Sequence, residues 1–369
     1  MRSVRPAAPA RPAPRRPAGR PRRRRGAVPL LALALAGLLT LVLGGCGSAA
    51  DAGGARTKVT IGIGGQPLLP YLPTTLAQQL GFYEDEGLDV ELQDLKSGSK
   101  ALQAMQGGSV DVASGYYDHT VQMQAKGKDV RAFVNMLRTP SIVLVVSPKA
   151  SREIKSPADL KGAKVGITAP GSSTDFFLKY LLGKNGLAPD AASVQAVGGE
   201  AAAIAAMESG RVDAAVMVDP AVSLLQKRMG GQELRILADT RTPQGSQAVF
   251  GVSSYPAAVF YAGHSWLEKN EATATKLTRA MLRTLRWIQD HSAQEIADAM
   301  PKEYAAGDPG VYRAAIEHAK PGYSADGAID ADGARAAAAL QKSFSPEVAA
   351  KEIDLGRTYT NDLVGAAAR

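Results

Sequence analysis

From residue 58 onward, short apolar blocks alternate with longer blocks in which apolar residues recur at helical spacing. The first series of apolar blocks predicts strands over residues 58–64, 88–92, 110–114, 130–137 and 142–147. Between them, the spacing predicts helices over residues 73–87, 99–107 and 121–125. The block 142–147 (IVLVVS) is almost continuously apolar, which is typical of a strand buried on both faces.

A second series of similar blocks follows the first. It predicts strands over residues 164–168, 193–197, 212–218, 234–238 and 258–261, and a helical turn over 157–160. Helices are expected over residues 172–183, 200–209 and 220–229, and most of the chain after Trp266 reads as helical. Strands that alternate with helices predict an α/β fold of mostly parallel sheets covered on both faces.

Two ten-residue segments of the two series repeat each other. LQAMQGGSVD (102–111) and IAAMESGRVD (204–213) are identical at five positions and lie 102 residues apart. Chance similarity between two alanine-rich helices is one explanation. The other is a pair of lobes of like construction, each built on a helix–glycine–strand unit. Two such lobes would form a cleft at the carboxyl ends of their strands, where open α/β sheets bind ligands.

The start of the chain has the pattern of an export signal. A cationic stretch that ends in Arg22–Arg25 precedes the apolar run 27–43, which is short for a membrane span. The residues Leu43-Gly44-Gly45-Cys46 resemble a bacterial lipobox. We therefore expect residues 1–45 to be a signal peptide, Cys46 to be lipidated, and residues 46–57 to be a flexible tether. A structural role for Cys46 is the alternative, and the choice between general and twin-arginine export stays open.

Composition narrows the classes of function. The formal charge is +8, but residues 1–46 hold ten arginines and no acidic residue, so the remainder carries about 8 − 10 = −2. A nearly neutral body argues against nucleic-acid binding. Cys46 is the only cysteine and the chain has four histidines, so we expect no metal site and no cofactor. The segment 326–333 (DGAIDADG) lacks the alternating acids and terminal glutamate of a calcium loop, and we expect a solvated turn.

Four stretches together make the chain recognisable. They are LAQQLGFYEDEGLDVEL (76–92), ALQAMQGGSVDVASG (101–115), SPADLKGAKVGITAPGSSTDFFLKYLLGKNGL (156–187) and GRVDAAVMVDPA (210–221). Over about residues 58–290 the chain resembles the periplasmic binding proteins of the nitrate/sulfonate/taurine ABC importers, the aliphatic-sulfonate, NMT1/THI5-like group. The resemblance implies a type II periplasmic binding protein fold, in which a hinge of two crossovers joins two lobes. It places the first lobe at 58–144, the second at 145–250, and the return to the first lobe with the C-terminal helices at 251–369.

The resemblance also implies a function. We expect a lipid-anchored, monomeric, extracytoplasmic receptor that captures a small organic anion or zwitterion and passes it to the permease and ATPase subunits of an ABC importer. The alternatives are a pyrimidine, thiamine-precursor or aromatic carboxylate ligand, and a sensory receptor with the same fold. Some proteins of this fold are enzymes that make a pyrimidine precursor of thiamine and rely on an active-site cysteine and histidines. Since the only cysteine here lies in the lipobox, we expect no enzyme.

Two loops of the first series are candidate ligand contacts. In the loop after the first strand, Gln66, Pro67 and Tyr71 offer an amide and a flat hydroxylated ring, although an ordinary proline-rich turn is the alternative. After strand 110–114, the candidates are Tyr116, Tyr117 and Asp118, which could instead cap the next helix.

Two loops of the second series complete the set. Ser172, Ser173 and Thr174 open a helix whose free N–H groups suit an anion, and the resemblance places family ligand contacts there; plain N-capping is the alternative. Asp219 follows strand 212–218 and could cap the next helix as well as face the cleft. Hinge residues 139–141 are weaker candidates. Two carboxylates beside a serine-rich loop favour a zwitterion, or a heteroaromatic compound, over simple nitrate.

Overall fold

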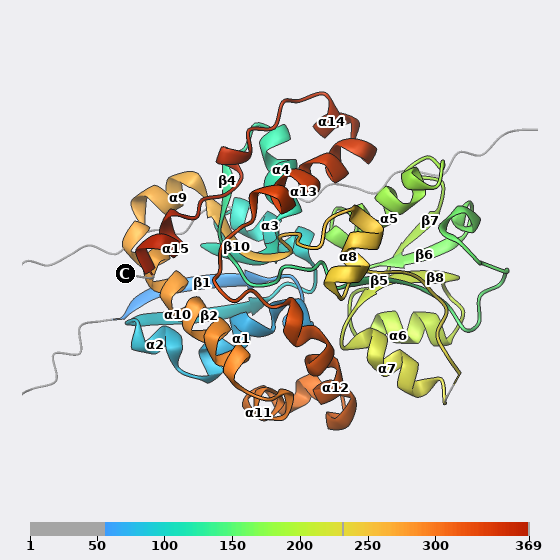
Figure 1. Ribbon diagram of the computed structural model, residues 1–369, viewed down its shortest axis with the longest axis horizontal. Helices are drawn as coiled ribbons and strands as arrows, with labels where there is room; N and C mark the ends of the chain where they lie inside the picture. The colour runs from blue at the N-terminus through green and yellow to red at the C-terminus, as the bar shows by residue number, and fades with distance from the viewer. Residues whose placement is uncertain (1–55, 231, 368–369) are drawn as a thin grey trace, which may run out of the picture. The chain divides into compact units, whose positions relative to one another are not determined.

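Two five-stranded sheets form the framework of the protein (Figure 1). The computed structural model describes residues 56–230 and 232–367. The first sheet has the order β2-β1-β3-β10-β4, and its strands are Leu88–Asp94, Thr57–Ile63, Val112–Tyr116, Ala258–Gly263 and Val130–Asn135. The second sheet has the order β7-β6-β8-β5-β9, with strands Ser193–Ala196, Lys164–Ile167, Ala214–Val218, Ile142–Val146 and Ile236–Asp239.

The helices lie between and after these strands. Those of the first part of the chain are α1 Leu72–Gln79, α2 Phe82–Asp85, α3 Gly98–Gln106 and α4 Asp118–Ala125. Around the second sheet lie α5 Ser173–Lys184, α6 Ala201–Glu208, α7 Ala221–Arg228 and α8 Pro243–Phe250. The C-terminal part contains α9 His264–Lys269, α10 Glu271–Asp290, α11 Ala293–Ala299, α12 Pro309–Ala319, α13 Ala331–Phe344, α14 Pro346–Ala349 and α15 Asp362–Ala367. Short 3₁₀ turns lie at Leu69–Tyr71, Pro157–Leu160, Lys302–Ala305, Lys320–Gly322 and Leu355–Arg357.

In each sheet four strands run in the same direction and one strand runs against them, which confirms the expectation of mostly parallel sheets. In the first sheet β1 pairs in parallel with β2 and β3, whereas β10 runs antiparallel to β3 and β4. In the second sheet β6 pairs in parallel with β7 and β8, whereas β5 runs antiparallel to β8 and β9. The antiparallel strands are those that enter a sheet when the chain crosses over from the other one. The strand β5, which the expected boundary at residue 144 divides, belongs wholly to the second sheet.

The internal repeat forms equivalent parts of the two sheets. Residues 102–111 end α3 and lead into β3, and residues 204–213 end α6 and lead into β8. Both β3 and β8 are the middle strands of their sheets. Asp111 and Asp213 each accept a backbone N–H, from Thr60 and Lys164 respectively, at 2.9 Å. The sequence identity therefore marks a repeated helix–strand unit, as the second of the two explanations predicts.

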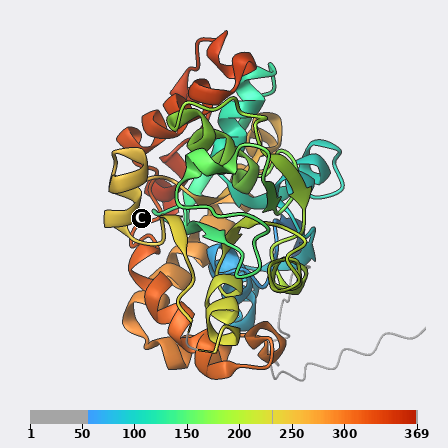
Figure 2. The same ribbon diagram turned by 90° about the vertical axis from the view of Figure 1, so that its right-hand side faces the viewer.

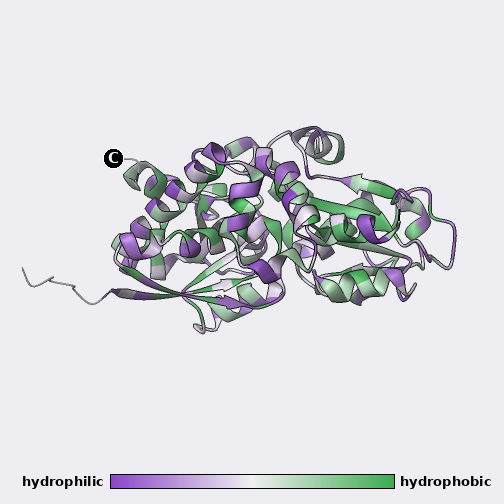
Figure 3. Cartoon of the chain, turned by 90° about the horizontal axis from the view of Figure 1, so that it is seen from below, coloured by the Kyte–Doolittle hydropathy of each residue, from purple (hydrophilic) through white to green (hydrophobic). Residues whose placement is uncertain are grey.

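Apolar residues fill both sheets, and the strands of the second sheet are coloured mostly hydrophobic in Figure 3. The helix α10 buries its apolar stripe, including Leu277, Met281, Leu285 and Ile288, against the first sheet. From the C-terminal part, α13 packs against α5 and α12 packs against α7, so this part contacts helices of the second sheet (Figures 1 and 2). The two sheets are thereby connected by more than their crossovers.

The sequence-based elements agree with the structure, apart from several details. The expected helix 73–87 is two helices, because Gly81 takes a left-handed conformation (φ 73°) that ends α1. The helix α8 was not expected. Thr57, placed in the tether, already belongs to β1. The expected signal peptide, Cys46 and the rest of the tether up to residue 55 lie outside the described residues. Of the helices in residues 56–230 and 232–367, none has the length and apolar character of a membrane span.

Candidate functional site

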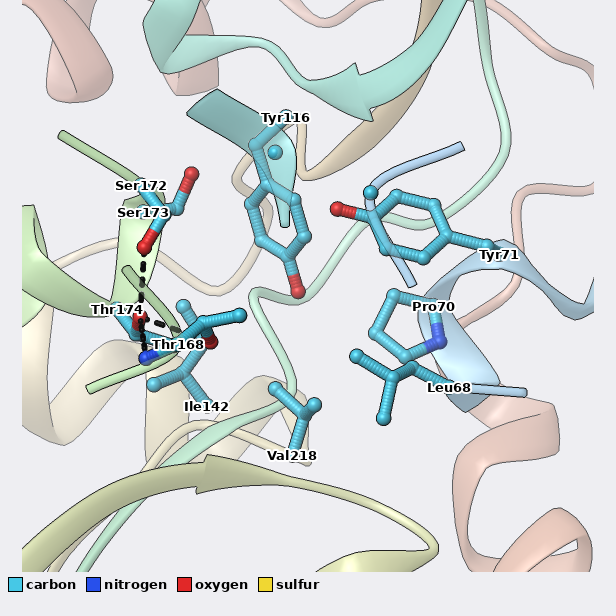
Figure 4. A pocket seen from close by; sticks show the side chains of 12 residues that line it. Leu68, Pro70, Tyr71, Tyr116, Ile142, Thr168, Ser172, Ser173, Thr174 and Val218 are labelled. Atoms are coloured by element: carbon cyan, nitrogen blue, oxygen red, sulfur yellow. Dashed lines mark hydrogen bonds between the residues drawn. The ribbon is translucent and has the colours of Figure 1, made fainter. Parts of the chain in front are cut away.

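A small pocket lies where strands of both sheets end (Figure 4). It is lined by Gly64 after β1, Tyr116 at the end of β3, Thr168 after β6 and Val218 at the end of β8, together with Ile142 at the start of β5. The cavity volume is about 20 Å³. That volume holds little more than one water molecule, so a solute would require the two sheets to move apart.

Five of the ten ligand residues expected from the sequence line this pocket: Tyr71, Tyr116, Ser172, Ser173 and Thr174. Residues that sequence reasoning did not single out complete the lining: Gly64, Leu68, Pro70, Gly98, Ile142, Thr168 and Val218. Among the described residues that line the pocket, none carries a charge at neutral pH. Hydroxyl groups and apolar surface therefore dominate its immediate chemistry.

Two tyrosines form one wall of the pocket. Tyr116 and Tyr71 pack edge to face, with ring centroids 6.1 Å apart, and the Tyr116 hydroxyl donates to the Pro140 carbonyl at 2.6 Å. Burial raises the pKa of both phenols, so both stay neutral. A Cβ on Gly64 would lie 2.7 Å from the Tyr71 hydroxyl and 3.0 Å from the Gly98 backbone, so the wall requires glycine at position 64. The only sign of this role in the sequence is that Gly64 ends a predicted strand.

The loop before α5 forms the opposite wall. The Ser172 hydroxyl donates to the Ala169 carbonyl at 2.6 Å, and the Thr174 hydroxyl donates to that of Thr168 at 3.0 Å. The buried Asp175 carboxylate accepts the Gly171 N–H at 2.8 Å and pairs with Lys179 at 2.9 Å. The side chains thus support the loop, and its start already carries one carboxylate beside the positive end of the helix. A ligand could accept a hydrogen bond from the Ser172 or Thr174 hydroxyl only by replacing the partner that the hydroxyl already has.

The Asp118 carboxylate lies directly behind Ser173. It accepts the Ser173 hydroxyl at 2.9 Å and is 4% exposed. No lysine or arginine pairs with it within the described part of the chain. Burial raises the pKa of Asp118 to about 7, although the hydrogen bond from Ser173 opposes the rise. A buried carboxylate without a basic partner suits a ligand group that has an N–H donor or a positive charge.

His119 connects the two walls. Its Nε2–H donates to the Gly171 carbonyl at 3.2 Å, and its Nδ1 accepts the Tyr261 hydroxyl at 3.3 Å. Burial lowers the pKa of His119 to about 4, which keeps the imidazole neutral in this arrangement. The ring also lies 2.9 Å from where a Cβ on Gly98 would be. Asp118 and His119, on one helix start, therefore hold both flanks of the loop 171–173 on the other side.

Further contacts join segments of the two sheets. Leu69 N–H donates to the Asp219 carbonyl at 2.9 Å, and Lys96 lies 3.6 Å from the Glu200 carboxylate. Leu68 packs over Gly199, where an added Cβ would lie 2.8 Å from its Cδ1. Segments of the two sheets thus contact each other at several points in this closed arrangement.

The other expected ligand residues lie away from the pocket lining. The Gln66 amide donates to the Thr75 hydroxyl at 3.3 Å, and Pro67 adjoins it on the half-buried outer side of the loop. Tyr117 is fully buried against Tyr359, and its hydroxyl bonds that of Thr358 at 2.6 Å. We therefore leave Gln66, Pro67 and Tyr117 out of the proposed site.

Asp219 serves a neighbouring pocket. Its carboxylate accepts the N–H and hydroxyl of Ser223 at 2.9 and 2.7 Å, so it caps α7, and it pairs with Arg241 at 3.1 Å. Sequence reasoning missed Arg241, because nothing in the local pattern connects it with a residue 22 positions earlier.

Comparisons with known proteins agree with this architecture. A family model described as NMT1/THI5 like matches residues 71–295. A protein of Bacillus subtilis (strain 168) named as a binding protein, YtlA, is 30% identical over 264 residues, which cover 69% of this chain and 73% of YtlA. The 4-amino-5-hydroxymethyl-2-methylpyrimidine phosphate synthase THI13 of Saccharomyces cerevisiae is 21% identical over 232 residues, or 63% of this chain and 67% of THI13.

Solved structures share the fold. A protein of Bordetella bronchiseptica RB50 is 43% identical with a TM-score of 0.80, covering 85% of this chain and 97% of its own. The alkanesulfonate-binding protein SsuA from Xanthomonas axonopodis pv. citri, bound to MOPS, is 19% identical with a TM-score of 0.65, covering 83% of this chain and 99% of its own. These similarities confirm the periplasmic binding protein fold expected from the sequence.

Proposed function

Because the chain belongs to the NMT1/THI5-like family, we propose that it is an extracytoplasmic solute-binding protein that delivers a small organic anion or zwitterion to an ABC importer. The observation that carries the proposal is the pocket between the carboxyl ends of strands from both sheets, closed by direct hydrogen bonds between their loops. A site of this design binds by enclosure and needs no reacting group. Its partners would be the solute and the permease and ATPase subunits of the importer.

The chemistry around the pocket favours a zwitterion over a plain anion. Asp118 is a buried acid without a basic partner in the described chain, so a solute that brings an ammonium or other N–H donor would complete it. A free inorganic anion such as nitrate would meet no lysine or arginine among the described lining residues. Ring compounds with an amino group fit the same argument, because Tyr71 and Tyr116 offer aromatic surface.

Isothermal titration at pH 8 tests the function and the class of solute together. The panel is taurine, β-alanine, 4-amino-5-hydroxymethyl-2-methylpyrimidine, ethanesulfonate and nitrate. We expect binding of at least one of the first three probes, because each carries an amino group. Heat with nitrate alone would overturn the proposed class of solute, and no binding of any probe would count against the function itself.

An enzyme on the same fold is the main rival, because THI13 is named as a synthase. The residues that could support such chemistry here have other partners: the buried His119 is neutral and bonds the Gly171 carbonyl and the Tyr261 hydroxyl. The only cysteine of the chain is Cys46, in the expected lipobox. A receptor that signals through a membrane partner would use the same pocket, and transport of a bound probe by the cognate permease would separate the two roles.

We further propose that the mature protein begins at Cys46 and is anchored to a membrane by lipid on that residue. The proposal rests on the apolar run 27–43 followed by Leu43-Gly44-Gly45-Cys46. Metabolic labelling with radioactive palmitate is expected to label the wild-type protein, and Cys46→Ser is expected to abolish the label. Equal labelling of both proteins would contradict lipidation at Cys46.

A further inference from the structure

Two neighbouring residues of α4 bond directly to the segment that begins α5, on the other sheet. The Ser173 hydroxyl donates to the Asp118 carboxylate at 2.9 Å, and the His119 Nε2–H donates to the Gly171 carbonyl at 3.2 Å. Asp118 and Ser173 are 4% and 7% exposed, so solvent hardly competes for their bond. We refer to these two hydrogen bonds as the latch. The latch ties the helix after β3 of the first sheet to the helix after β6 of the second.

An aromatic contact accompanies the latch. Phe176, one turn further along α5, packs edge to face on His119 with ring centroids 5.9 Å apart. On another side, Phe176 stacks on Phe344 of α13 at 5.8 Å, and all three rings are buried. The helix α13 also packs against α4. Contacts of the protein with itself therefore stabilise the closed arrangement of the two sheets around α5.

The latched arrangement leaves no room for a solute of the proposed class. The pocket of Figure 4 has a cavity volume of about 20 Å³, which is the space of roughly one water molecule. A solute can therefore enter only if the sheets separate. A hydrogen bond is lost once its heavy atoms are more than about 3.5 Å apart, so a separation of about 1 Å along the bond from Ser173 to Asp118 breaks it. The latch and a solute in the pocket thus exclude each other.

We propose that Ser173 sets the affinity of the receptor by competing with the solute: its hydroxyl holds Asp118 in the latched arrangement, and the amino group of the solute takes its place. The proposal rests on the function proposed above and adds the residue that opposes binding. Since the latched protein must open before it binds, the apparent affinity is lowered by the fraction of unlatched molecules. This reduction is the same for every solute, because the latched arrangement contains none.

Isothermal titration of Ser173→Ala and wild type at pH 8 tests the competition, with taurine, β-alanine, 4-amino-5-hydroxymethyl-2-methylpyrimidine and ethanesulfonate as probes. Alanine is the residue that helices accommodate best, so the change leaves α5 intact. Each probe that binds to wild type is expected to bind to the variant about tenfold more tightly, and by the same factor. Weaker or unchanged binding would overturn the proposal, because a hydroxyl that contacts the solute directly would be missed by it.

Small-angle X-ray scattering without solute gives a second readout. The latch holds the sheets together in wild type, so the radius of gyration of Ser173→Ala is expected to be larger. Addition of a probe that binds should reduce the radius of the variant, because the solute then joins the sheets. Equal radii of the two proteins without solute would overturn the proposal whatever the affinities are.

Glu200→Gln is the matched control, because Glu200 also makes a contact across the sheets. Its carboxylate lies 3.6 Å from the Lys96 ammonium, but the two side chains are 35% and 60% exposed. An exposed pair of this kind contributes little, so the radius and the affinities should equal those of wild type. Effects as large as those of Ser173→Ala would overturn the special role of Ser173. If wild type and Ser173→Ala bind no probe, the receptor function is in question, and the radii still decide whether Ser173 holds the two sheets together.

Discussion

At pH 8, the Asp118→Asn protein is expected to bind taurine, or another amino-bearing probe that wild type binds, about 100-fold more weakly. Asp118 is buried and its pKa is about 7, so most of the carboxylate is ionised at this pH. An ammonium group enclosed beside it gains a buried charge partner, whereas an amide at the same position carries no charge. Removing one partner of a buried pair typically costs about 3 kcal/mol or more, which corresponds to about two orders of magnitude in affinity.

The solute itself provides the control for this experiment. Ethanesulfonate lacks the amino group, so its affinity should not fall when Asp118 becomes asparagine. In wild type, taurine affinity should decrease as the pH falls below 7, because protonation neutralises Asp118. The variant should show no such decrease. Equal taurine affinity of variant and wild type at pH 8 would contradict the assignment of Asp118 to the amino group.

Local patterns were sufficient to place most elements of this fold. The 3₁₀ turn Pro157–Leu160 and the strand Ile142–Val146 agree with the sequence to within one residue, because proline and a continuous apolar run are strong local signals. The helix α8 was missed because its sequence PQGSQAVF buries only Ser246 and so has no apolar stripe. The antiparallel direction of β5 and β10 was missed for another reason: it depends on which sheet a strand joins after the crossover.

The candidate site was also only partly predictable from the sequence. Loops at the carboxyl ends of strands were the right places to search, and they provide Tyr116 and the serines of the α5 loop. Sequence alone could not tell that Tyr116 faces the pocket while Tyr117 faces the core, because the chain leaves a strand there and enters a helix. The sequence also could not show which acidic residue has a basic partner. Asp118 and Asp219 look alike in sequence, but a distant residue, Arg241, pairs with only the second.

The pH dependence of stability should reveal the buried pair Asp118 and His119. The pKa of Asp118 is about 7 in the folded protein, against an ordinary value of 3.8, so the folded state binds more protons between these values. The free energy of unfolding therefore falls as the pH rises through this window. The pKa of His119 is about 4 in the folded protein, against an ordinary value of 6.5, so its contribution to stability rises with pH between them. The two effects oppose each other from pH 4 to 6.5.

Removing one partner should therefore expose the effect of the other. Across pH 4 to 6.5, the unfolding free energy of Asp118→Asn is expected to rise by roughly 3 kcal/mol relative to wild type, at 1.36 kcal/mol per pKa unit. That of His119→Gln should fall by a similar amount. Urea unfolding of the ligand-free proteins at pH 4.5, 5.5 and 6.5 measures both differences. The tyrosines around Asp118 stay neutral in this window, and Lys126 is the charged group that acts on His119. If the unfolding free energy of both variants changes with pH as that of wild type does, both groups meet water in the ligand-free protein, because burial is the largest cause of both pKa shifts.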